Sequence, residues 1–106
     1  MLVYKGTLIK DSLLDEAFLN FVSITKEDPP CLYFTVGEDF VASVAEEISK
    51  SLKPRGWCAQ IENEYSKLVI FPNKILKFAP TDAAARGKAI EYGKSLGLSD
   101  IQMKGI

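Results

Sequence analysis

Residues 57–80, WCAQIENEYSKLVIFPNKILKFAP, decide how the rest of the chain folds. Their first part carries apolar side chains at every second position (W-x-A-x-I), which is typical of a half-buried β-strand. Residues 67–71 and 75–79 read as two further strands, and the Phe-Pro-Asn-Lys sequence between them is typical of a tight turn. This segment therefore predicts three consecutive strands at the centre of a sheet.

The composition predicts one domain and excludes several kinds of chemistry. The chain has 106 residues, of which 47% are hydrophobic, so it can form its own core. The net charge of -1 disfavours a protein that holds nucleic acid mainly by neutralising phosphates. No histidine is present, which excludes Ser-His-Asp and Cys-His mechanisms and most transition-metal sites. We therefore expect no catalytic residues, no metal and no cofactor.

The sequence also carries a prediction about location. No apolar run approaches the ~20 residues of a membrane-spanning helix, and the first residues do not resemble a secretory signal. The only two cysteines, Cys31 and Cys58, are too few for a disulfide scaffold. We expect a cytoplasmic protein with ordinary free thiols, and we keep a redox pair as the less favoured interpretation.

The chain divides at the Asp-Pro-Pro sequence of residues 28–30, which predicts a loop. Before it, residues 2–9 read as a strand and residues 13–22 as an amphipathic helix. The whole chain is expected to be a single domain, 1–106. Residues 1–28 are interpreted as an N-terminal βα extension, and residues 31–106 as the core.

The core begins with a strand at residues 31–36, in which Leu32, Phe34 and Val36 share one face. A helix with an apolar stripe follows, and then the three strands of residues 57–79. The last helix opens with Thr81 as the expected N-cap and closes at Gly97.

This order predicts an α+β fold of the ferredoxin-like βαββαβ type, completed by a short strand at residues 101–104. Two helices would cover one face of a mainly antiparallel sheet, and residues 75–79 would be an added hairpin strand. A meander of strands with different pairing at its ends is the competing arrangement.

The second face of that sheet is the first candidate surface. Residues 67–71 are apolar at alternate positions on both sides, so an apolar patch would remain on the face away from the helices. The candidate interaction residues are Tyr33, Thr35, Gln60, Val69 and Phe71. The N-terminal strand and helix, a second copy of the chain, or a ligand could cover this face.

The start of the last helix is a second candidate. Arg86 and Lys88 lie one turn into a helix that begins with small residues, so they are candidate contacts for a phosphate or another anion. No glycine-rich loop precedes them, and close packing of the small residues on the sheet is the favoured interpretation.

RNA binding is a third possibility. The stretch CLYFTVG at residues 31–37 resembles the first-strand aromatic motif of the RNA-recognition-motif family, and the helix after residue 80 takes the place of that family's second helix. The resemblance implies base stacking on a sheet face. KLVIFPNK lacks the alternating basic, glycine and aromatic residues of that family's third strand, so the resemblance stops there.

The sequence thus predicts a small non-catalytic protein that acts through protein–protein contact, with self-association as a homodimer expected. The alternative is a domain that binds a small-molecule or phosphate-bearing ligand on the second sheet face. Nucleic-acid binding ranks third.

Overall fold

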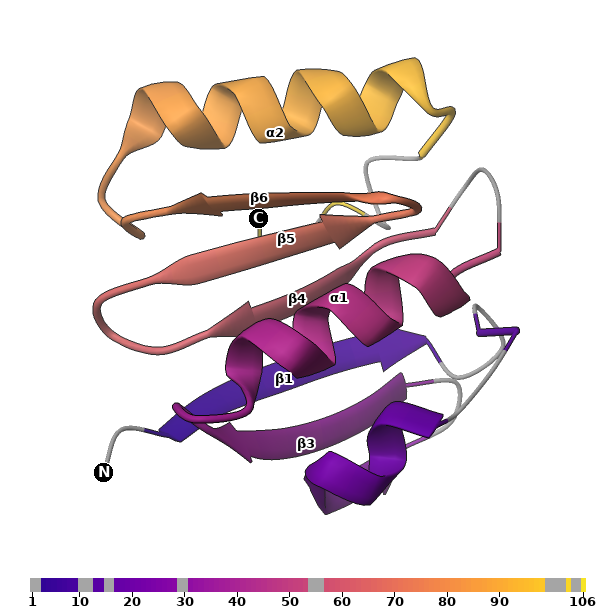
Figure 1. Ribbon diagram of the computed structural model, residues 1–106. Coiled ribbons are helices and arrows are strands. Elements are labelled where there is room, and N and C mark those ends of the chain that lie inside the picture. The colour runs from indigo at the N-terminus through magenta and orange to yellow at the C-terminus, as the bar shows by residue number, and fades with distance from the viewer. Residues whose placement is uncertain are drawn as a thin grey trace.

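The protein is a small α+β domain with a six-stranded antiparallel sheet at its centre (Figure 1). The structure is a computed structural model, and it describes residues 3–9, 13–14, 17–28, 31–53, 57–98, 103 and 106. Its elements are, in chain order, β1 (Val3–Ile9), η2 (Ala17–Phe21), β2 (Ser23–Asp28), β3 (Cys31–Gly37), α1 (Val41–Ser51), β4 (Ala59–Glu62), β5 (Lys67–Phe71), β6 (Lys74–Phe78) and α2 (Ala83–Ser95). The strand order in the sheet is β2-β3-β1-β4-β5-β6.

The first strand of the chain lies in the middle of this sheet. β1 pairs antiparallel with both β3 and β4, so β3 and β4 run in the same direction and α1 connects them. The sequence predicted a ferredoxin-like βαββαβ core in residues 31–106 and treated residues 1–28 as an N-terminal addition to it. The observed order differs because all seven residues of β1 pair with β3, a longer ladder than the five-residue β5 can form.

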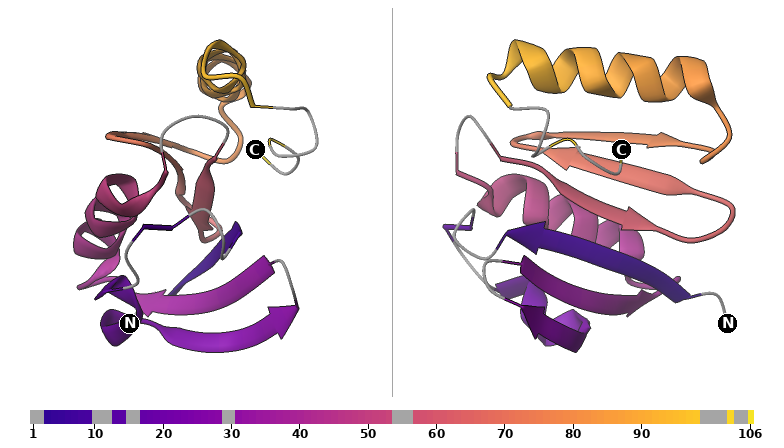
Figure 2. Two further views of the ribbon diagram at one scale, coloured as in Figure 1. Left: turned by 90° about the vertical axis from the view of Figure 1, so that its right-hand side faces the viewer. Right: turned by 180° about the vertical axis from the view of Figure 1, so that it is seen from behind.

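The two helices cover opposite faces of the sheet, whereas the sequence predicted both on one face. Leu68 and Ile70 of β5 belong to the core under α1, and Val69 and Phe71 belong to a second core formed with α2. Figure 2 (left) shows α1 on one side of the sheet, with α2 and the C-terminus displaced toward the other. A strand that is apolar on both faces needs cover on both.

The core under α1 has the composition that the sequence indicated. Leu32, Phe34 and Val36 of β3 are buried on the α1 side, and they pack with Val44 and Ile48 of the helix. The alternation of β3 is therefore confirmed, and its other face consists of half-buried residues.

Gly6 lets an aromatic ring pack directly against the backbone in this core. It lies opposite Phe34 in the β1–β3 ladder, and the Phe34 ring lies directly over the position that a side chain at residue 6 would occupy. The same ring meets Phe18 of η2 edge-on, with 5.7 Å between the ring centroids. Gly6 thus makes room for the ring on which η2 packs.

The segment between β1 and β2 differs from the helix predicted for residues 13–22. Leu13 forms an isolated bridge with Leu52, and the Leu14 N–H donates to the Ser51 carbonyl at 2.6 Å. These contacts hold Leu13 and Leu14 against the end of α1, and among the described residues of this segment η2 is the one helical turn, a 3-10 helix. β2 follows as an edge strand, which the sequence did not predict because SITKED has no apolar alternation.

The ends of α2 show one correction and one confirmation. Asp82, rather than Thr81, is the N-cap, and its carboxylate accepts from the Ala85 N–H. Gly97 has φ of 85° and closes the helix as expected, with the Leu98 N–H donating to the Gly93 carbonyl. Of the strand predicted at residues 101–104, only Met103 lies within the described residues, and it is a buried turn residue.

The role of Gly6 can be tested with a matched glycine. Gly6→Ala should lower the free energy of unfolding by about 1–3 kcal/mol, because the buried Phe34 ring must move. Gly87→Ala, in open space on α2, should raise it by about 0.5–1 kcal/mol through helix propensity. Urea denaturation measures both. Equal effects of the two substitutions would contradict the described contact of Gly6.

Candidate binding surface

Over β1 and β3, one face of the sheet carries no helix of the described residues, as the view from behind shows (Figure 2, right). On this open face Thr7 lies between Tyr33 and Gln60, and Lys5 lies between Thr35 and Glu62. The two rows are polar, and their residues are exposed or half-buried, as is usual for the solvated side of an antiparallel sheet.

The structure brings together three of the five predicted interaction residues. Tyr33, Thr35 and Gln60 are half-buried neighbours on the open face. Val69 and Phe71 are fully buried under α2 and cannot belong to an exposed surface. The apolar patch expected on the second face is therefore covered at β5 by the chain's own last helix and by residues that follow it.

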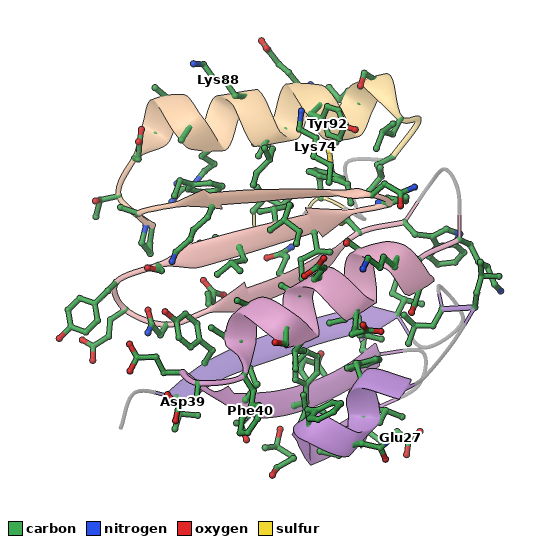
Figure 3. The ribbon with its side chains drawn as sticks, viewed as in Figure 1. Glu27, Asp39, Phe40, Lys74, Lys88 and Tyr92 are labelled. Atoms are coloured by element: carbon green, nitrogen blue, oxygen red, sulfur yellow. The ribbon has the colours of Figure 1, made fainter. Side chains whose placement is uncertain are left out.

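The predicted anion contact is not assembled. The Arg86 guanidinium donates to the Pro80 carbonyl, and Lys88 extends into solvent away from the sheet (Figure 3). The carboxylate of Asp82 already accepts a backbone N–H at the start of α2. A helix N-terminus that carries its own carboxylate has little remaining attraction for an anion.

The two cysteines lie on strands that β1 separates. Cys31 pairs with Ile9 of β1, and Cys58 directly precedes β4 on the other side of β1. Two strand spacings amount to roughly 9–10 Å, which is beyond the reach of a disulfide. Neither cysteine forms a disulfide, and burial raises the pKa of the Cys58 thiol from 9.0 to about 11.

Tyr33 has two neighbours that affect its chemistry. The charge of the Cys31 sulfur, and then a hydrogen bond with it, raise the pKa of the Tyr33 phenol above 10.0. Lys26 of β2 lies over the same ring, with its Nζ 5.9 Å from the centroid. The phenol is therefore stabilised in its neutral form, which can donate a hydrogen bond but is a weak base.

The most unusual surface feature is an exposed aromatic pair on the α1 side. Phe21 ends η2 and Phe40 immediately precedes α1, and their ring centroids are 6.1 Å apart. Their exposed fractions are 53% and 51%. Ile24 of β2, opposite the inward-facing Phe34, lies on the same side of the sheet and is also exposed. We call Phe21, Ile24 and Phe40 the aromatic patch.

Packing explains why Phe21 is presented there. In a 3-10 helix the side chains at i and i+3 align, so Phe18 and Phe21 project from the same side of η2. Phe18 is buried against Phe34, and Phe21 lies one turn further, at the border of the core. Sequence reasoning missed this patch because it assigned Phe21 to the buried stripe of a longer helix. The available signal was Phe40, a large side chain at the edge of the α1 stripe.

Two shallow hollows were also considered. One of about 360 Å³ lies between α1 and the β5–β6 turn, and its lining includes Ser49, Lys50 and Lys74. Another of about 420 Å³ lies at one end of the open face, and its lining includes Lys5, Glu62 and Glu64. Both are open and of mixed charge, without the convergent polar groups of a small-molecule site.

The described parts of the chain hold neither a metal-ligand cluster nor a helix that could span a membrane. No three of their Cys, Asp and Glu side chains gather closely enough to hold a metal ion. None of their helices combines the length and the hydropathy needed to cross a membrane.

Comparisons with protein-family models, with curated proteins and with solved structures gave no match. The functional argument therefore rests on the geometry and chemistry of the surfaces described above.

The raised pKa of the buried Cys58 thiol gives a direct prediction. In Cys31→Ser protein, the remaining Cys58 thiol should react with iodoacetamide more than tenfold more slowly at pH 8 than a free cysteine, because only the thiolate is nucleophilic. Its rate should keep rising with pH toward about 11. Mass spectrometry of quenched samples measures the rate, and Cys58→Ser protein, which retains Cys31, is the control. A rate plateau below pH 9 would contradict the burial of Cys58.

Proposed function

We propose that this protein is a non-catalytic domain that binds a protein partner through the aromatic patch. The observation that carries the proposal is the contact between Phe21 and Phe40, two half-exposed rings supplied by separate elements. With Ile24, they expose on the order of 300 Å² of apolar surface. Exposed apolar surface of this size on one side of a protein is often an interaction site, and aromatic residues are enriched in protein interfaces.

Binding is supported over catalysis by the titration behaviour of the chain. The strongly shifted group, Cys58, is shifted toward the thiol form, which is opposite to what a nucleophile requires. The carboxylates nearest the patch, Glu38 and Asp39, are both exposed. A catalytic acid would need an apolar environment that raises its pKa.

Two cysteines that form no disulfide also support a reducing compartment as the place of action. We therefore propose that the domain works in the cytoplasm.

Site-specific photo-crosslinking tests the proposed function. The photo-reactive residue p-benzoylphenylalanine replaces Phe40 in the cells that naturally produce the chain. The control carries it in place of Tyr65, an aromatic residue in the β4–β5 turn that is more exposed than Phe40. We expect one discrete protein adduct from position 40 and none from position 65.

Purified wild-type protein should compete for that adduct, and the Phe21→Ser/Phe40→Ser protein should not. Both rings are half-exposed, so the double variant should remain folded, which thermal unfolding checks. Absence of a specific adduct at position 40, or an equal yield at position 65, would refute binding at the patch.

A further inference from the structure

The aromatic patch borders a rim of acidic side chains. Glu38 and Asp39 lie in the turn between β3 and α1, and both are exposed. Figure 3 shows Asp39 beside Phe40. Within the described residues neither carboxylate takes part in an ion pair. Glu47, two helical turns after Phe40, is exposed on the same stripe of α1. The side chains next to the apolar surface are thus negatively charged and can pair with a positively charged partner.

The outer edge of β2, which pairs with no further strand of the described residues, also borders the patch. β2 is the outermost strand of the sheet, and all six of its residues are exposed. Ile24 of β2 lies on the patch side, so an added strand would place alternate side chains on that side as well. An edge strand offers N–H and C=O groups to an extended peptide.

The second half of β2 restricts which strand can pair with it. The register with β3 shifts between Ile24 and Lys26, and Lys26, Glu27 and Asp28 follow as charged residues. Bulges and charges on an edge strand oppose indiscriminate pairing between sheets. The uncharged half, Ser23 to Thr25, lies nearest to Phe21.

We infer that the partner contributes an extended, basic segment that pairs with the first half of β2. Apolar side chains at alternate positions of the segment contact Phe21, Ile24 and Phe40. A lysine or arginine at its end lies near Glu38 and Asp39. This inference rests on the proposed function and adds the chemistry of the partner to it.

A second copy of the chain fits this surface less well. A two-fold contact through the patch would bring the Glu38 and Asp39 carboxylates of both copies together around a small apolar area. Like charges at that distance repel, and about 300 Å² per copy is well below the ~800 Å² per partner of a stable interface. Charge complementarity therefore favours a basic partner over the homodimer that the sequence predicted.

The probe for this inference is a displayed library of random ten-residue peptides, selected on the wild-type protein. Peptides that also bind the Phe21→Ser/Phe40→Ser protein are removed, so that the remaining peptides depend on the patch. We expect the selected sequences to carry apolar residues at alternate positions together with lysine or arginine.

The dissociation constant of a selected synthetic peptide is then measured on matched charge variants. Glu38→Gln/Asp39→Asn should weaken binding about tenfold, because two charge pairs at the rim of the interface are lost. Glu64→Gln/Glu91→Gln changes the net charge equally at exposed positions away from the patch and should leave the dissociation constant within about twofold. Hydrogen exchange of the β2 amides should slow in the complex.

The possible results separate this inference from the proposed function. Patch-dependent peptides without basic residues, or equal effects of the two charge variants, would overturn the basic partner and leave the proposed function standing. Unchanged exchange of the β2 amides in a formed complex would overturn the strand pairing.

If no patch-dependent peptide is selected, the inference is wrong, and the crosslink at position 40 decides the proposed function. A dimer in light scattering that Phe40→Ser abolishes would make a second copy the partner and overturn the inference.

Discussion

Burial of β5 on both of its faces is the constraint on which the rest of the structure depends. Leu68 and Ile70 require cover on one side of the sheet, and Val69 and Phe71 require it on the other. One layer of helices cannot provide both, so α1 and α2 lie on opposite faces. Phe71 meets Tyr92 of α2 edge-on, with 4.9 Å between the ring centroids, which shows how closely the second cover fits.

The turn between β5 and β6 contacts both helices, α1 and α2, that cover β5. Asn73 has φ of 61°, a conformation that asparagine tolerates, and its N–H donates to the Ser49 carbonyl of α1 at 2.9 Å. Lys74, the next residue, places its Nζ 4.5 Å from the centroid of the Tyr92 ring. The β5–β6 turn is therefore held by one helix through a backbone hydrogen bond and by the other through a cation–π contact.

The burial of β5 on both faces determines where a partner can bind. Because the chain covers β5 on both sides, an apolar binding surface cannot form there. The exposed apolar side chains of the proposal lie at the other end of the sheet, where η2 is too short to cover the start of α1. Phe18 fixes η2 to the core, and Phe21 and Phe40 remain half-exposed as a consequence.

Local patterns made several elements predictable. The alternation of β3 and β4, the two-sided apolar run of β5 and the stop of α2 at Gly97 are all encoded within a few residues. The strand order was not predictable in the same way, because the position of β1 depends on ladder length and on room for the Phe34 ring over Gly6. The sequence of β2 has no alternation of apolar and polar residues, because an edge strand with no helix over it needs no buried face. The patch depends on β2 and on η2, so it was not predictable either.

The account's central claim is that the chain itself covers the second face of β5, and an isotope-filtered nuclear Overhauser experiment tests it most directly. Protein with labelled phenylalanine rings is mixed with protein with labelled tyrosine rings. We predict a strong contact between the Phe71 and Tyr92 rings in doubly labelled protein and none between molecules in the mixed sample. A Phe71 contact that appears only between molecules would contradict the claim, because a second copy would then cover β5.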